Sequence, residues 1–357
     1  MKTFLLIISV LTLSISLPGC AGGQKYILIS GYAQGGTYSV KIGMDGVRET
    51  PRDIKDSIDS ILLRIDNSLS GYNKGSTLSR LNAGERVQPE DIFREIYSKS
   101  YSVWEETGGA FDVAAGALFD VWGFGFSSDS LPSPEKVRQT LSGVGMKRLV
   151  PSIEAEEICS SDLIKEGASE TDGTSPKTWN SAPKLNFNAI AQGYSCDLVA
   201  SYLYSIGVKD MLVDIGEIFC DGLNPSGLPW SIGIDRPYDG NDSPGEDLSA
   251  VWLSDGRPCG LVTSGNYRKF YIKDGVKYSH TIDPRNGYPV THSLLSATIV
   301  APDAASADAY ATYCMVVGLD EAQAFIDSRP DIEGFLIYDD GGQMKSWNSP
   351  GFILRGE

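Results

Sequence analysis

One of the two histidines in this chain of 357 residues lies in a short stretch that also holds several other polar groups. His280 stands between Ser279 and Thr281, and residues 283–287 (DPRNG) follow at once. Because an unperturbed imidazole has a pKa of about 6.5, His280 is suited to removing a proton at neutral pH. Two interpretations stay open from this stretch alone: a general base, or a structural histidine at a strand end.

A carboxylate and a hydroxyl lie four residues apart in the stretch SADAYAT. On a helix this spacing places Asp308 and Thr312 on one face. Such an oxygen pair is half of a Mg²⁺ site, which water and a phosphate would complete. The alternative is a helix on which both side chains face solvent or cap a turn. Two histidines cannot form a His-rich metal site, so oxygen atoms would have to hold any metal.

Two further stretches carry weaker signals. Residues 185–197 (LNFNAIAQGYSCD) are predicted to turn into a helix, and helix starts attract phosphate through their free N–H groups. Most such junctions only reverse the chain. The aromatic residues around 110–112 (AFD) are predicted either to stack on a flat ring or to fill a core. The sequence has no nucleophile-elbow, Walker or HExxH motif.

The elements that must position these residues indicate an α+β fold. Strands in hairpin-like runs, with helices in separate groups, favour this class over a doubly wound sheet. Residues 71–84 are predicted to be a turn or loop, and 153–183 and 238–247 to be exposed loops. Helices are expected at about 53–69, 91–107, 190–206, 304–317 and from 320, and a short helical stretch that ends in an aromatic Gly loop is expected over 110–125. Strands are expected near 26–42, 211–220, 230–235, 249–254, 260–263, 268–273, 294–300 and 334–339.

The first 19 residues have the features of a secretory signal, with Lys2 before an apolar run that is too short to span a bilayer. Residues 17–20 (LPGC) resemble a bacterial lipobox, in which Cys20 is lipidated; a plain signal peptide with an incidental Cys is the alternative. We expect a tether over 20–30 and a single domain over 31–357. The expected location is the bacterial cell envelope, anchored to a membrane by lipid and facing the periplasm.

Charge and cysteine content exclude some classes of protein. A net charge of -16 argues against a nucleic-acid partner. Beyond Cys20, five scattered cysteines without a C-x-x-C motif form neither a zinc site nor a disulfide framework. One disulfide is possible, but the sequence does not identify its members. His292 acquires no role and is predicted to be a surface residue.

Seven segments, in this order, resemble the FAD:protein FMN transferases, which are the ApbE-like lipoproteins. The segments are GGTYSV, YNKGSTLSRLN, GGAFDVAAGALFDVWGFG, NAIAQGYSCDLVA, LVDIGEI, TSGNYRKFYIKDGVKYSHTIDPRNGYPV and ADAYATYCMVVG. The resemblance spans about residues 33–340. It implies an α+β fold of two closely packed lobes of mainly antiparallel sheet with helices, and a ligand cleft between the lobes.

The resemblance also implies an activity. Members of this family bind FAD as substrate, with Mg²⁺ as cofactor, and transfer FMN to a Thr or Ser hydroxyl of an acceptor protein. A phosphoester bond forms and AMP is released. The acceptors are typically flavoprotein subunits of membrane redox complexes. Two alternatives stay open: a pyrophosphatase that converts FAD to FMN and AMP, and a lipoprotein that binds FAD without turnover.

Carried over by position, the resemblance implies a role for each of several residues. Asp308, Thr312 and the backbone C=O of Ala189 match the metal ligands. His280 matches the catalytic histidine, and we expect Asp283 to orient its imidazole. The positions that match FAD contacts are Gly35, Tyr72, Ala110, Phe111, Asp112, Asn186, Gln192 and Ile282. Gly35 replaces the usual Met, Asn186 a common Asp, and Gln192 a common Lys or Glu, which removes an apolar contact and charge near the nucleotide.

Overall fold

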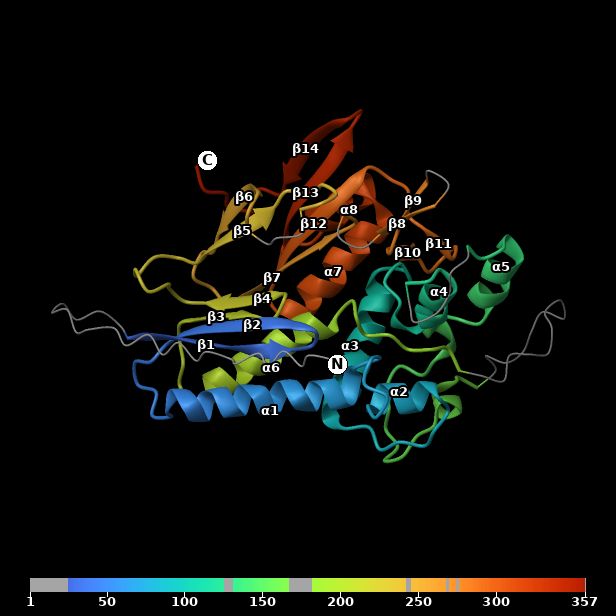
Figure 1. Ribbon diagram of the computed structural model, residues 1–357, viewed down its shortest axis with the longest axis horizontal. Coiled ribbons are helices and arrows are strands. Elements are labelled where there is room, and N and C mark those ends of the chain that lie inside the picture. The colour runs from blue at the N-terminus through green and yellow to red at the C-terminus, as the bar shows by residue number, and fades with distance from the viewer. Residues whose placement is uncertain are drawn as a thin grey trace, which may run out of the picture.

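The computed structural model describes residues 25–124, 131–166, 182–241, 245–267, 270–273 and 276–356, with only the backbone described at 270–273 and 276–277. Within these residues, eight strands form one antiparallel sheet in the order β1-β2-β3-β4-β7-β12-β13-β14 (Figure 1). Its strands are β1 (Tyr26–Ala33), β2 (Gly36–Gly43), β3 (Met211–Asp214), β4 (Ile218–Asp221), β7 (Cys259–Gly265), β12 (Leu294–Ala301), β13 (Glu333–Asp340) and β14 (Gln343–Asn348).

Both faces of this sheet are apolar, because successive residues of a strand point to opposite sides. On β4, Phe219 belongs to the larger core and Cys220 to a smaller one. On β7, Val262 belongs to the larger core and Leu261 to the smaller one. Helices cover the larger core. The smaller core lies under the hairpin of β5 (Ser231–Asp235) and β6 (Leu248–Leu253).

The helices of the larger core follow from apolar spacing and from their caps. In α1 (Pro51–Leu69), Ile54, Ile58, Leu62, Ile65 and Leu69 are buried on one face. The Thr50 side chain caps this helix by accepting a hydrogen bond from the Asp53 N–H. The other helices here are α2 (Thr77–Asn82), α3 (Asp91–Glu106), α6 (Ala191–Ser205), α7 (Ala304–Val317) and α8 (Leu319–Asp327). Of these, α7 packs against β7, β12 and α6, as Figure 1 shows.

A smaller body stands beside the main sheet. It contains α4 (Gly116–Val121), α5 (Pro134–Ser142), and the short strands β10 (Ile282–Asp283) and β11 (Tyr288–Pro289). A separate apolar cluster holds it together, including Leu118, Trp122, Val137 and Ile282. The Trp122 indole N–H donates to the Gly287 carbonyl at 2.7 Å, which ties the end of α4 to the turn between β10 and β11. Nearby, β8 (Phe270–Lys273) pairs with β9 (Val276–Ser279). The predicted α+β class is confirmed.

Some sequence expectations need correction. Residues 71–84 contain the helix α2, because Ser76 caps it and its two leucines are buried. The stretch 153–166, predicted to be exposed, packs inward: Ile153, Ile158 and Leu163 are buried, and η3 (Ser160–Leu163) forms a 3₁₀ turn. Residues 167–181 of the expected insertion lie outside the described residues. The helix α5 and the strands β9 and β14 were not expected.

The structure can be compared with only part of the expected signal and tether at the N-terminus. Residues 1–24, with the signal and Cys20, lie outside the described residues. β1 begins at Tyr26, inside the range expected for the tether, because Tyr26 already pairs with Gly43 of β2. Any tether therefore ends before Tyr26. No helix in the described part of the chain is long and apolar enough to cross a bilayer.

His292 is not the surface residue that we expected. Its Nε2 lies 2.9 Å from the Met315 carbonyl, near the end of α7. Burial lowers its pKa from the ordinary value. The ring also lies close to Gly318, where a Cβ atom would approach it to 3.0 Å. His292 is thus part of the packing at the C-terminal end of α7.

Candidate functional site

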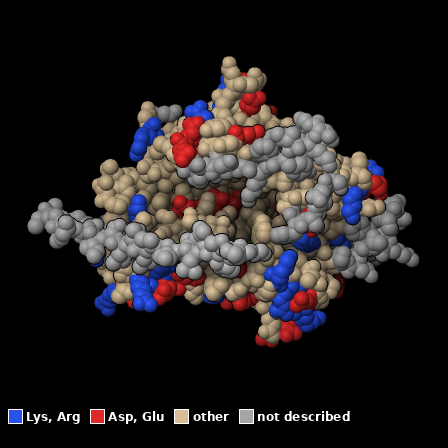
Figure 2. All heavy atoms as spheres, viewed as in Figure 1, with Lys and Arg blue, Asp and Glu red and all other residues tan. Residues whose placement is uncertain are grey.

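A cavity of about 650 Å³ lies between the main sheet with its helices and the smaller body. Residues from α7, from the turn before α6 and from β7 line one side, and residues around α4 and β10 line the other. Figure 2 shows acidic side chains in the hollowed middle of one face of the molecule. The predicted site residues that line the cavity are Tyr72, Ala110, Phe111, Asp112, Asn186, Ala189, Gln192, His280, Ile282, Asp308 and Thr312.

Asp308 is held at the cavity wall by the contact between two helices. It is 5% exposed, and its Oδ2 accepts a hydrogen bond of 3.1 Å from the Gly193 N–H in the first turn of α6. Thr312 follows one turn later on the same face of α7 and also lines the cavity. The predicted oxygen pair is therefore present on one helix face, with its carboxylate fixed in direction.

The start of α7 is fixed by two other carboxylates. Asp303 caps the helix by accepting a hydrogen bond of 2.7 Å from the Ser306 N–H. Asp197, on α6, accepts hydrogen bonds from the N–H groups of Ala304 at 2.8 Å and Ala305 at 2.9 Å. Both interactions satisfy N–H groups that a helix start leaves without partners. The two helices are thereby joined at the turn that precedes Asp308.

The surroundings of Asp308 fit a bound cation. Burial raises its pKa above the ordinary value, and the nearby Asp197 carboxylate raises it further. Within the described residues, no Lys or Arg forms an ion pair with Asp308. A carboxylate, a hydroxyl and a backbone carbonyl at Ala189 are hard oxygen donors of the kind that Mg²⁺ prefers. The described residues contain no cluster of three or more His, Cys, Asp or Glu side chains suited to a metal, so any ion here needs oxygen from substrate or water.

The segment before α6 brings Asn186 and Ala189 to the cavity by a compact turn. The Asn186 N–H donates to the Val113 carbonyl at 2.7 Å, and its side-chain oxygen accepts from the Asn188 N–H at 2.9 Å. Asn82 exchanges two hydrogen bonds with the backbone of Leu185, at 2.8 and 2.9 Å. These bonds hold the turn against α2 and the loop after α3, so the backbone at Ala189 is well supported.

Asp112 is a partly exposed carboxylate on the opposite wall, with most of its surroundings formed by protein. It accepts hydrogen bonds from the N–H groups of Ala114 at 2.8 Å and Met146 at 3.1 Å. Burial raises its pKa to about 6, against the lowering effect of those two bonds. Phe111, beside it, is 2% exposed yet reaches the cavity. This stretch therefore combines an apolar wall with one carboxyl group that titrates near neutral pH.

His280 lies at the end of β9 and lines the cavity with Thr281 and Ile282. The Phe124 ring packs edge-on to the imidazole, with the ring centroids 6.5 Å apart. His280 is the one histidine among the described residues that line this cavity. It is thus placed where a bound ligand can meet it.

Asp283 has a different environment from the one that we expected. Its carboxylate accepts hydrogen bonds from the Arg285 guanidinium at 3.0 Å and from the Asn286 amide at 3.2 Å. It is not among the residues that line the cavity. Because its oxygens bind the turn that follows, we assign Asp283 to holding that turn and not to orienting the imidazole.

Gly35 is also outside the cavity lining. It occupies the two-residue turn between β1 and β2 with a φ of 83°, which glycine adopts without strain. Gln34, at φ 52°, donates to the Ser195 hydroxyl at 2.6 Å and so attaches this turn to α6. The glycine is explained by the turn. Tyr72, by contrast, lines the cavity and is 67% exposed.

Comparison with known proteins decides the family. The model of the ApbE family matches residues 34–336. The chain belongs to the ApbE family. An FAD:protein FMN transferase of Haemophilus influenzae is 30% identical over 350 residues, 96% of this chain and 95% of the relative. An Escherichia coli K12 protein of the same name is 30% identical over 94% of this chain and 90% of its own length. The predicted resemblance is confirmed.

Solved structures agree with the ApbE assignment. The flavinyl transferase ApbE of Pseudomonas stutzeri, in its apo form, superposes with a TM-score of 0.76 at 29% identity, covering 92% of this chain and 96% of that one. The Vibrio cholerae flavin transferase ApbE gives a TM-score of 0.75 at 28% identity, covering 92% of this chain and 100% of that one. The α+β architecture is therefore shared with ApbE proteins.

The ApbE site contains residues that the sequence did not single out. Most of them lie in the seven segments that carried the resemblance. Those segments could therefore have pointed to these residues, although no single residue stood out. Glu217 lies in LVDIGEI, Thr263 and Ser264 open TSGN, and Met315 follows ADAYAT. The full set of additional lining residues is Val113, Ala115, Phe119, Gly123, Phe124, Asn188, Glu217, Thr263, Ser264, Gly265, Tyr267, Thr281, Pro284, Met315 and Val316.

Proposed function

We propose that this chain transfers FMN from FAD to a Thr or Ser hydroxyl of an acceptor protein and releases AMP. The observation that carries the proposal is one cavity in which an oxygen pair on α7 and a histidine at the end of β9 line the same space. The names of the relatives support the same reaction. The cavity volume, about 650 Å³, is in the ordinary range for cofactor sites.

FAD binding is served by both apolar and polar walls. Tyr72, Phe111 and Phe124 offer aromatic surface to the ring systems. Asn186 and Gln192 offer amide groups without charge. The Gln192 side chain is already oriented by donating to the Ile215 carbonyl at 3.1 Å. The described lining includes Asp112, Glu217 and Asp308 but no Lys or Arg, so a pyrophosphate needs a cation to enter this acidic site.

That cation is proposed to be Mg²⁺, held by Asp308, Thr312 and the Ala189 carbonyl. When bound, it would neutralise charge on the pyrophosphate as the bond between the two phosphates breaks. The protein's own contribution is to fix the Asp308 carboxylate through the Gly193 N–H. Because Asp308 is 5% exposed, water would screen its charge less than it screens a carboxylate on the surface.

His280 is proposed to accept the proton of the acceptor hydroxyl. The hydroxyl oxygen then attacks the FMN phosphorus, a new P–O bond forms, and the bond to the AMP phosphate breaks. Asp283 would support His280 only indirectly, because its hydrogen bonds to Arg285 and Asn286 hold the turn that follows the histidine. Ile282, buried beside His280, packs into the cluster of the smaller body.

Incubation with FAD, Mg²⁺ and an acceptor peptide containing Thr, followed by mass spectrometry, tests the proposal. The expected product is the peptide carrying one FMN, with AMP in equal amount. His280→Ala and Asp308→Ala variants should form little of it. No FMN on a validated acceptor would disprove transfer. Release of free FMN at a comparable rate without acceptor would favour a pyrophosphatase, and retention of intact FAD would favour a binding protein without turnover.

We further propose that Cys20 is lipidated after removal of residues 1–19 and that the chain is anchored to a membrane of the bacterial cell envelope, facing the periplasm. The lipobox-like LPGC sequence supports this. Acceptors would then be flavoprotein subunits of membrane redox complexes. A Cys20→Ser variant should lose lipid label and move from the membrane to the soluble fraction. Unchanged membrane association would refute the anchor.

A further inference from the structure

Two cysteines face each other across neighbouring strands on the far side of the sheet from α7. Cys220 on β4 and Cys259 on β7 are directly opposed in the antiparallel register. Their Sγ atoms lie 3.8 Å apart, although the residues are 39 positions apart in the chain. Both belong to the smaller core under the β5–β6 hairpin. Among the described cysteines, this is the pair whose sulfur atoms are in contact.

The backbone geometry of this pair suits a covalent bond. Opposed residues in an antiparallel ladder have Cα atoms about 4.5 to 5.5 Å apart, and disulfides span Cα separations of about 4.4 to 6.8 Å. Because the strands already provide this separation, rotation of the two side chains can bring the sulfur atoms from 3.8 Å to bonding distance. No strand has to change register.

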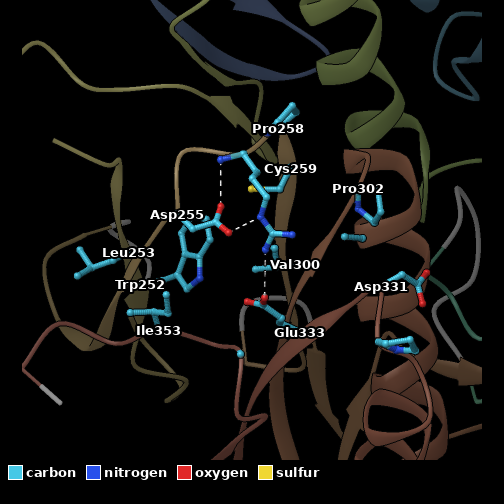
Figure 3. A pocket seen from close by; sticks show the side chains of 14 residues that line it. Trp252, Leu253, Asp255, Pro258, Cys259, Val300, Pro302, Asp331, Glu333 and Ile353 are labelled. Carbon is cyan, nitrogen blue, oxygen red and sulfur yellow. Dashed lines mark hydrogen bonds and ion pairs between the residues drawn. The ribbon is translucent and has the colours of Figure 1, made fainter. Parts of the chain in front are cut away.

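The two thiols differ in access. Cys220 is fully buried, whereas Cys259 is 8% exposed and lines a second cavity, of about 320 Å³. Figure 3 shows the Cys259 side chain among the residues that line this cavity, which include Asp255 and Val300. A reagent that enters here meets Cys259 first. The opposed Cys220 then lies behind it as the only neighbouring thiol of the described chain.

We propose that Cys220 and Cys259 form a cross-strand disulfide by exchange with a small disulfide such as oxidised glutathione. The Cys259 thiolate attacks one glutathione sulfur, and the first glutathione thiol leaves. Cys220, as its thiolate, attacks the Cys259 sulfur of the mixed disulfide, and the second glutathione thiol leaves. The two cysteines give up two electrons and two protons, and the oxidant takes up both as two thiols.

The bond would join the two strands that lead to the larger cavity. Glu217 comes just before β4, and Thr263 lies on β7, and both line the candidate active site. Cys220 lies three residues after Glu217, and Cys259 lies four residues before Thr263. A covalent tie at this point fixes the strand pair beneath the site and closes a long loop of the unfolded chain. We therefore expect the oxidised protein to be more resistant to heat than the reduced protein.

Peptide mapping of the full chain tests the proposal directly. The folded protein is treated with oxidised glutathione, alkylated and digested without reduction. Trypsin alone leaves both cysteines in one peptide, because Arg236 and Arg257 each precede a proline. A second protease that cuts after Glu246 separates them. The expected result is a linked pair of fragments, two hydrogens lighter than their sum, that reduction splits.

Variants supply the control and a second readout. Cys220→Ala and Cys259→Ala should each abolish the linked fragments and the rise in melting temperature on oxidation. Cys196→Ala, which removes a buried thiol elsewhere, should preserve both effects. The proposal is overturned if both cysteines of the folded wild type still react with the alkylating reagent after oxidation. A glutathione adduct on Cys259 with Cys220 still free would also overturn it.

Discussion

The Asp308 carboxylate on α7 accepts a hydrogen bond of 3.1 Å from the Gly193 N–H on α6. This bond is possible because the two helices touch at a residue without a side chain. A Cβ atom at Gly193 would lie 2.2 Å from the Ala304 carbonyl oxygen. The direction of the proposed metal ligand therefore depends on the close approach of a neighbouring helix backbone.

Gly193→Ala should destabilise the protein strongly. The added methyl group would meet backbone atoms of Ala304, which cannot move aside as a flexible side chain would. We expect a loss of about 3 kcal/mol or more in the free energy of unfolding, measured by denaturant titration. Gly71→Ala is the matched control, because a Cβ atom there meets nothing within 4 Å. Equal stability of the two variants would contradict the close packing of α6 on α7.

Asp308→Asn should remove transfer while keeping the fold. The amide oxygen can still accept from Gly193, but the negative charge that would hold a cation is gone. We expect kcat/KM for flavin transfer to fall by about 100-fold or more. The melting temperature at neutral pH, measured in parallel without metal, should be unchanged or higher. Full activity of this variant would rule out Asp308 as a metal ligand.

Thr312 allows a test of the hydroxyl alone. Thr312→Val keeps the shape but loses the oxygen, whereas Thr312→Ser keeps the oxygen and loses a methyl group. We expect the valine variant to need a higher Mg²⁺ concentration for half-maximal activity and the serine variant to resemble the wild type. The measurement is a Mg²⁺ titration of FMN transfer. Similar titration curves for both variants would show that the hydroxyl is not a ligand.

His280→Gln should slow the transfer step and leave FAD bound. Glutamine retains hydrogen-bonding groups but cannot act as a base at neutral pH. The loss of a general base predicts a fall in kcat of about 100- to 10,000-fold. Quenching of flavin fluorescence should give an FAD affinity close to that of the wild type. A normal kcat, or a loss confined to FAD affinity, would refute the role of base.

Asp112 predicts a pH dependence of stability. Burial raises its pKa to about 6 in the folded protein, above the ordinary value of 3.8. Between these values the folded state binds more protons, so its stability falls as pH rises from about 4 to about 6. Relative to Asp112→Asn, the wild type should lose about 3 kcal/mol over this window, an upper bound from the pKa difference. Urea unfolding of both proteins at each end of the window measures this loss. An equal change in the free energy of unfolding for the two proteins would contradict the prediction.

The helices with one apolar face could be predicted from the sequence, and short capped elements could not. The spacing of Ile54, Ile58 and Leu62 marks α1 within two residues of its observed start. In α2, a single serine cap and two buried leucines are too few to stand out in a stretch rich in Gly, Asn and Ser. β14 has mostly exposed residues and forms because it pairs with β13, which no local pattern encodes.

The site was predictable where chemistry is encoded in local spacing. The i, i+4 spacing of Asp308 and Thr312 predicted a shared helix face, with a solvent-facing pair as the alternative, and the structure places both residues in the cavity. Asp283 was assigned to the histidine because it is close in sequence, but its carboxylate accepts hydrogen bonds from Arg285 and Asn286. Glu217 and Tyr267 reach the cavity only through sheet topology. Contacts of this kind depend on how β4, β7 and α7 come together, and single-sequence patterns do not contain that information.

The nearly complete burial of α7 has a consequence for how the chain tolerates change. Ten of its fourteen residues are buried, on all sides of the helix, whereas α1 buries a single stripe. A saturation library scored for soluble expression should therefore show intolerance at most positions of Ala304–Val316, with consecutive intolerant residues over 307–311 and 314–316. In α1 it should show intolerance only at every third or fourth position. The segment that carries Asp308 and Thr312 is thus constrained by packing as much as by chemistry, and its sequence should diverge slowly even where activity is not under selection.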